Sequence, residues 1–173
     1  KKIFPLFISN LLVIIYVRTD QVMLASFSTS NDLANYSVVL KLIEPLAIIP
    51  SAICATALPF IFSKLSSSSN VKNIIYGYCS LLFYISIVIT VPLFLFGNLL
   101  VTFLFGEAYL DSGLLMMIMS ITIPFSFFSI FNGMLLVVYN QQALAPARSL
   151  LGVLINILLN SMLIPFWGAI GAA

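Results

Sequence analysis

The chain has 173 residues, of which 62% are hydrophobic and only 7% are charged, and its formal net charge is +2. Soluble domains are about half apolar and about a quarter charged, so a lipid bilayer is the expected solvent for this sequence. The net charge is too small to indicate a nucleic-acid partner. The sequence has no histidine, which excludes His-ligated metal sites and His-based catalytic triads. We therefore expect a protein that contacts membrane lipids, with no metal site and no catalytic residues.

Five apolar segments follow one another along the chain, and each is long enough to cross a bilayer as a helix, which takes about 20 residues. They cover residues 3–27, 33–62, 73–96, 112–138 and 144–166, and short polar connections join them. None alternates polar and apolar residues as the strands of a membrane barrel do. The sequence therefore predicts an all-α fold, a polytopic membrane helix bundle of about five transmembrane helices. We expect a single membrane domain over residues 1–173.

Basic residues gather on one side of this predicted topology. The residues on that side are Lys1, Lys2, Lys64, Lys72 and Arg148, and the opposite connections carry Asp32, Glu107 and Asp111. Cytoplasmic loops are rich in Lys and Arg, so the multi-pass topology is predicted to place the Lys1 end in the cytoplasm. The chain does not begin with Met, and residues 168–173 resemble the start of another helix. We therefore expect it to be part of a longer chain.

Four ionisable residues lie within the first two predicted spans: Arg18, Asp20, Lys41 and Glu44. Each costs at least about 2.5 kcal/mol at the bilayer centre if it faces lipid, so each is expected to face protein or a water-filled cavity. In an antiparallel hairpin, Arg18 is expected at the depth of Glu44, and Asp20 at the depth of Lys41. Arg18 and Asp20 are about 200° apart around the helix, so they cannot point at one spot. We interpret the four as a substrate or ion pathway; the alternative is a pair of buried salt bridges that only fix helix packing.

Two prolines interrupt the second predicted span. Pro45 directly follows Glu44, and Pro50 lies five residues further on. Each removes a backbone hydrogen bond and can kink a helix. We expect a helix hinge here, with a static kink as the alternative.

A small and polar stripe marks the last predicted helix. Gly152, Asn156 and Asn160 recur at a spacing of four residues and so lie on one helix face. Such stripes let membrane helices approach closely and form hydrogen bonds with one another. Helix packing is therefore the favoured interpretation, with substrate contact as the alternative.

Several segments together resemble a known family. Residues 16–24 read YVRTDQVML and residues 33–37 read LANYS. The first matches the R-x-D-x-x-M-L signature of polysaccharide flippases, although Asn35 stands where that family commonly has Gly before the Tyr. KLIE at 41–44, FGEAY at 105–109 and NILLN at 156–160 also resemble family segments. The chain is thus similar to O-antigen-type flippases of the multidrug/oligosaccharidyl-lipid/polysaccharide exporter superfamily.

The resemblance implies a transporter of about twelve helices in two six-helix lobes, of which this chain would supply helices seven to eleven. It implies flipping of undecaprenyl-diphosphate-linked oligosaccharide across the cell inner membrane, together with the remaining helices of the full-length transporter. Arg18 and Lys41 would meet the diphosphate or acidic sugars, while Asp20 and Glu44 would hold these cations in the empty cavity. No cofactor is implied beyond a coupling proton or sodium ion, carried by one of the two carboxylates.

Three other functions fit parts of the sequence. A drug or small-molecule exporter of the same superfamily would expose acidic groups to an amphipathic cation. A membrane-bound polymerase or transferase would need catalytic groups in a sizeable loop, and residues 63–72 offer only Ser, Asn and Lys as polar side chains. We therefore do not expect an enzyme. A non-catalytic membrane subunit would leave the four charges with no role beyond packing.

Overall fold

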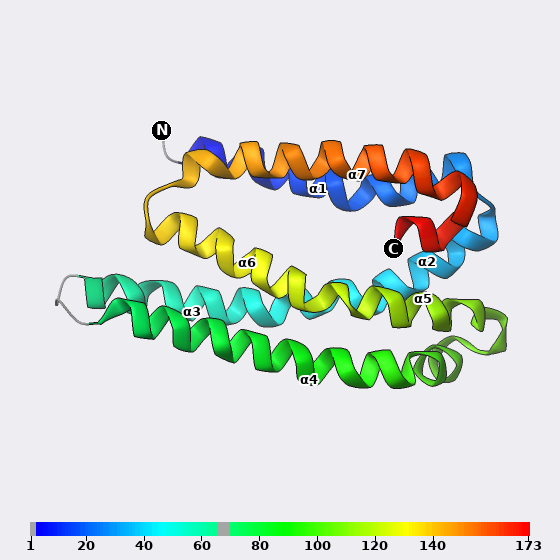
Figure 1. Cartoon of the computed structure of the whole chain (residues 1–173), viewed down its shortest axis with the longest axis horizontal. Helices are drawn as coiled ribbons and strands as arrows, with labels where there is room; N and C mark the ends of the chain where they lie inside the picture. Colours follow the sequence, from blue (N-terminus) through cyan, green and yellow to red (C-terminus); the bar gives the residue numbers. More distant parts are fainter. Residues whose placement is uncertain (1–2, 66–69) are drawn as a thin grey trace.

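The computed structural model describes residues 3–65 and 70–173, and this part of the chain consists of helices and short turns. The α-helices are α1 (Ile3–Phe27), α2 (Ser30–Ile43), α3 (Ile48–Leu65), α4 (Val71–Phe105), α5 (Asp111–Ser120), α6 (Thr122–Val138) and α7 (Ala145–Trp167). Four 3-10 helices complete the fold: η1 (Glu44–Ala47), η2 (Glu107–Tyr109), η3 (Gln142–Leu144) and η4 (Gly168–Ala172). The long helices lie along one axis, with α1 beside α7 on one side and α3 beside α4 on the other (Figure 1).

The all-α membrane bundle predicted from the sequence is confirmed. Within the described residues, four helices are long and apolar enough to cross a membrane, or five if the bent pair α5–α6 counts as one span. The first and last helices lie within a residue of their predicted bounds. The third is longer than expected, because α4 runs on through the short apolar stretch to Phe105. The second predicted helix is confirmed as one candidate span, Ser30–Leu65, which contains the 3-10 segment η1, whereas the fourth is a bent pair of helices.

Proline explains where the divided helices break. Pro45 has no backbone N–H to continue the hydrogen bonds of α2, and η1 separates α2 from α3 at this point. The second break lies at Ile121, where α5 and α6 meet at 41°. Pro124 cannot donate to the Ser120 carbonyl one turn earlier. The Thr90 hydroxyl of α4 donates to that carbonyl instead, at 3.4 Å. Neighbouring side chains thus satisfy the backbone groups that proline frees.

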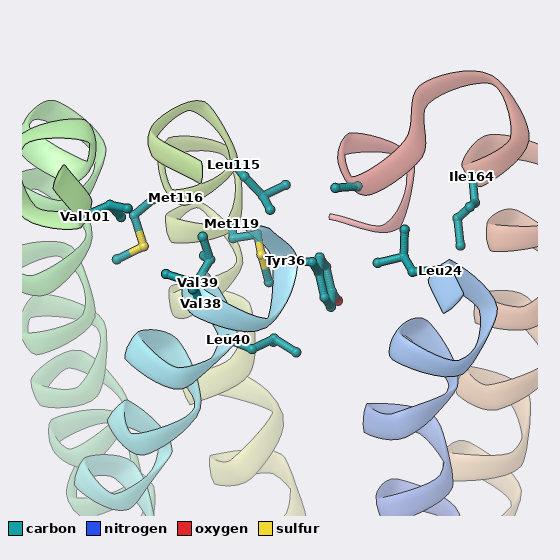
Figure 2. Close-up of a cluster of buried hydrophobic side chains, with 11 residues drawn as sticks. Leu24, Tyr36, Val38, Val39, Leu40, Val101, Leu115, Met116, Met119 and Ile164 are labelled. Atoms are coloured by element: carbon teal, nitrogen blue, oxygen red, sulfur yellow. The ribbon is translucent and has the colours of Figure 1, made fainter. Parts of the chain in front are cut away.

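Two clusters of buried apolar side chains hold the helices together. One joins α1, α2, α4, α5 and α7 around Leu24, Tyr36 and Met116. Figure 2 shows Tyr36 of α2 directed toward Leu24 of α1 within this cluster. The other joins α3, α4 and α6 around Ile61 and Phe127. Many large apolar side chains point outward instead, including Phe103 at 85% exposed. An outer surface of this kind is suited to lipid and not to water.

Candidate functional site

A carboxylate of α1 lies at the centre of a polar cluster between α1, α2 and α7. The Oδ1 atom of Asp20 accepts hydrogen bonds from Nδ2 of Asn156 at 2.8 Å and from Nδ2 of Asn160 at 2.7 Å. Its Oδ2 atom accepts a hydrogen bond from the Tyr36 hydroxyl at 2.9 Å. Asn160 and Tyr36 are only 4% and 2% exposed. Three neutral donors from two other helices therefore satisfy one carboxylate inside an apolar bundle.

Helix geometry explains how distant residues meet in this cluster. Asn156 and Asn160 are one turn apart on α7 and so present their amides on the same face. The same offset of 140 residues separates Ser9 from Ser149, whose hydroxyls are 2.7 Å apart, and Asp20 from Asn160. A constant offset means that α1 and α7 run parallel, side by side (Figure 1). The helix pair thus carries a hydroxyl contact near one end and the carboxylate–amide contacts further along.

The other three ionisable residues of the predicted pathway lie elsewhere. Arg18 is exposed, and its Nη1 donates to Oε1 of Gln21 on the same helix at 3.1 Å. Lys41 and Glu44 are exposed at the end of α2 and the start of η1. Arg18 and Asp20 therefore point in different directions, as their spacing predicts.

The alternative of two buried salt bridges is wrong for the described residues. None of the four ionisable side chains has an opposite charge within 4.0 Å in this part of the chain. Across the hairpin, Asp20 bonds Tyr36, five residues before the Lys41 that we expected at its level. The charges are thus not neutralised in pairs inside the bundle.

The predicted hinge and packing residues have different surroundings. Pro45 is exposed within η1, and Pro50 is buried in the first turn of α3, so the helix break falls where the prolines predict it. On α7, Asn156 and Asn160 bond across to α1, as a packing stripe should. A methyl group added at Gly152 would meet nothing within 4 Å. Gly152 therefore makes no close helix contact in the described residues, and its packing role stays a prediction.

Sequence reasoning did not assign Tyr36 to the site. The same hairpin rule that matches depths across α1 and α2 places Tyr36 within about four residues of the level of Asp20. A search for hydroxyl donors at that depth would have found it. Within residues 3–65 and 70–173, no group of three or more Cys, Asp or Glu side chains is arranged to hold a metal ion.

The fold and this cluster define a multi-pass membrane helix bundle that carries polar groups within its spans. A family model described as "Polysaccharide biosynthesis protein" matches residues 4–114, well over half of the chain. The chain belongs to this polysaccharide biosynthesis family. The matched region includes Arg18, Asp20, Lys41 and Glu44, whereas the two asparagines of α7 lie beyond it. No curated protein and no solved structure matches the chain.

Proposed function

We propose that this chain is part of a flippase that moves undecaprenyl-diphosphate-linked oligosaccharide units across the inner membrane for O-antigen-type surface polysaccharide. It forms helices seven to eleven of a two-lobed transporter, with the Lys1 end in the cytoplasm. Membership of the polysaccharide biosynthesis family supports the pathway. The long apolar helices support a membrane step within it.

The exposed charges within apolar spans carry the proposal. Arg18 and Lys41 lie on the outside of this bundle with no carboxylate within 4.0 Å among the described residues. A cation at this depth is costly against lipid, so its surroundings in the working protein are polar. A diphosphate offers several acceptor oxygens and at least two negative charges, which suit an Arg guanidinium and a Lys ammonium. We assign these two side chains to the diphosphate of the lipid-linked substrate.

The balance of exposed charge favours this substrate over an amphipathic cation. Glu44 is exposed beside Lys41 and is the one observation that fits a drug or small-molecule exporter. Two exposed cations against one exposed carboxylate make the sum of the exposed charges within these spans positive. A net positive charge attracts an anionic substrate and repels a cationic one.

Asp20 is the carboxylate that we assign to the coupling ion. Its three hydrogen-bond partners are neutral, so its negative charge stays uncompensated within an apolar bundle. A proton or a sodium ion bound at the carboxylate would supply the missing charge. Side-chain amides carry both a donor and an acceptor, so rotation of Asn156 and Asn160 would present oxygens to a cation. The donor set around Asp20 therefore fits either ion, and no other cofactor is required.

The breaks in the second and fourth spans are suited to alternating access. Pro45 lies within the short η1 segment, directly after Glu44, and Pro50 lies in the first turn of α3. A change of angle at this hinge would move α3 relative to α2, the helix that carries both Lys41 and the Tyr36 partner of Asp20. Substrate release and ion binding would thus be linked through α2.

Replacing Lys41 tests the proposed function. In cells that depend on the full-length protein, Lys41→Ala should lower surface polysaccharide by at least about tenfold, since one charge-assisted contact to phosphate is lost. Lys41→Arg keeps the charge and is the matched control, for which substantial polysaccharide should remain. Membrane abundance of each variant is measured by immunoblot. Normal surface polysaccharide in the Lys41→Ala strain, at equal abundance, contradicts the proposal.

A further inference from the structure

A groove of about 520 Å³ opens at the end of the bundle opposite to the N-terminus, where the starts of α2 and α5 meet η4 (Figure 1). Its polar and aromatic lining comes from Asn31, Asp32, Asn35, Asn98, Asp111 and Trp167. The volume falls within the range of about 300–1,000 Å³ that is usual for small-molecule sites. None of these residues belongs to the Asp20 cluster, so the groove is a separate feature of the fold.

An amide nitrogen at the wall of the groove lacks a partner. Asn35 is only 6% exposed, and its Oδ1 accepts a 2.7 Å hydrogen bond from the Ser112 hydroxyl of α5. Among the described residues, the Nδ2 atom of Asn35 donates no hydrogen bond. No fully buried side-chain nitrogen or oxygen in this part of the chain lacks a partner, so the Asn35 Nδ2 atom must reach the groove. A buried residue thus offers a fixed, free donor to whatever fills the space.

The remaining lining adds an aromatic surface and acceptors. Trp167 is 64% exposed, and it lines the groove at the end of α7. Asp111 is exposed at the start of α5 and leaves its carboxylate free to accept hydrogen bonds. Asp32 is different, because its Oδ2 already accepts hydrogen bonds from the Ser28 and Thr29 hydroxyls. Among the described residues no Lys or Arg lines the groove, so the lining that they form has a negative net charge.

This combination matches the chemistry of a sugar. Each sugar hydroxyl both donates and accepts, and so needs amide and carboxylate groups side by side. A pyranose ring also has an apolar C–H face that packs on an aromatic side chain, as Trp can provide while keeping its N–H for a hydrogen bond. Two carboxylates and no cation disfavour acidic sugars by like-charge repulsion.

We propose that this groove binds neutral sugar units, with Asn35 and Asp111 taking hydroxyls and Trp167 stacking on a ring. The groove lies at the end of the bundle that faces outside in the proposed topology, so it would hold the glycan as it leaves. The source of the saccharide rests on the proposed function, whereas the binding chemistry of the groove does not.

Trp167 gives a direct measurement, because it is the single tryptophan of these 173 residues and its replacement removes its fluorescence from the signal of the full-length protein. Purified full-length protein in detergent is titrated with maltotriose and, separately, with triacetylchitotriose, and the tryptophan fluorescence is followed. The Trp167→Phe protein supplies the background. At least one trisaccharide should produce a saturable change that the background lacks. Asp111→Asn should weaken its binding by about tenfold, as expected for losing a hydrogen bond to a charged group.

Glu107→Gln is the matched control, because Glu107 is an exposed carboxylate in the same connection that does not line the groove. Its affinity for the trisaccharide should equal that of the unchanged protein. The proposal that the groove binds sugar is wrong if neither trisaccharide produces a saturable change up to its solubility limit. It is also wrong if Asp111→Asn and Glu107→Gln weaken trisaccharide binding equally. If Lys41→Ala cells lose surface polysaccharide but the purified protein binds neither trisaccharide, sugar binding in the groove is rejected and the proposed function is not. Trisaccharide binding with normal polysaccharide in those cells rejects only the proposed function.

Discussion

Two regions of this molecule handle charge in a membrane in opposite ways. Asp20 lies between helices, and neutral side chains from α2 and α7 satisfy both of its oxygens. Arg18, two residues earlier on the same helix, points outward, and its side chain donates a hydrogen bond to Gln21 on the same helix. Lys41 and Glu44 share this outward exposure. One region keeps its charge enclosed with a complete set of hydrogen bonds, and the other presents charge to the surroundings of the bundle.

The difference teaches which of these charges belongs to the fold. A half-buried carboxylate with three partners links three helices, so its removal leaves polar groups unpaired. An exposed charge without an ionic partner links nothing within the described residues. Substitutions should therefore separate the two regions by stability as well as by transport.

The largest effect is expected when the enclosed charge is neutralised. Asp20→Asn keeps the size of the side chain and can still accept from the two asparagines, so the protein should reach the membrane in normal amount. Without a carboxylate the coupling ion has no binding group, and surface polysaccharide should fall by at least about tenfold. Polysaccharide staining and immunoblotting check this. Unchanged polysaccharide at equal abundance removes Asp20 from the coupling role.

A medium effect is expected from a single hydrogen bond of the same cluster. Tyr36→Phe deletes the donor to Asp20 Oδ2 and keeps the buried ring. Interhelical hydrogen bonds in membranes contribute about 0.6–1.7 kcal/mol, which corresponds to a few degrees in the midpoint of thermal unfolding. Unfolding in detergent is followed by circular dichroism. Tyr76→Phe is the control, because Tyr76 is 69% exposed on α4 and should leave the midpoint unchanged. An equal midpoint for all three proteins means that the cluster does not stabilise the fold.

The smallest effect on stability is expected at the exposed charges. Arg18→Ala and Glu44→Ala should each change stability little, and their coupling energy in a double-mutant cycle should be below about 0.5 kcal/mol. A buried ion pair behaves differently, because removing one partner costs about 3–5 kcal/mol and removing both relieves the penalty. Midpoints of the four proteins of the cycle give the coupling energy. A large coupling would restore the salt-bridge interpretation and end the contrast between the two regions.

The candidate site could be predicted in part. The spacing of Arg18 and Asp20 was enough to show that the two diverge, because 100° per residue is a fixed property of the α-helix. The periodicity of Asn156 and Asn160 was enough to place them on one face. Their meeting with Asp20 was beyond sequence reasoning, since 136 and 140 residues separate the pairs and only the packing of α7 against α1 brings them together. Gly152 shows the same limit, because the residue type suggested a close contact that the neighbouring helices do not make.

The sequence by itself determined the solvent, the all-helical architecture, the approximate spans and the positions of the charges. These follow from composition and from local periodicity, which every residue carries with it. Only the tertiary structure decided that α5 and α6 meet at an angle, that Asp20 lies between helices while Lys41 is exposed, and that Asn35 lines a groove with Trp167. The physical reason is that hydrogen bonds and burial depend on which helix faces lie against one another. That choice is made by the packing of all the helices together and not by any one segment.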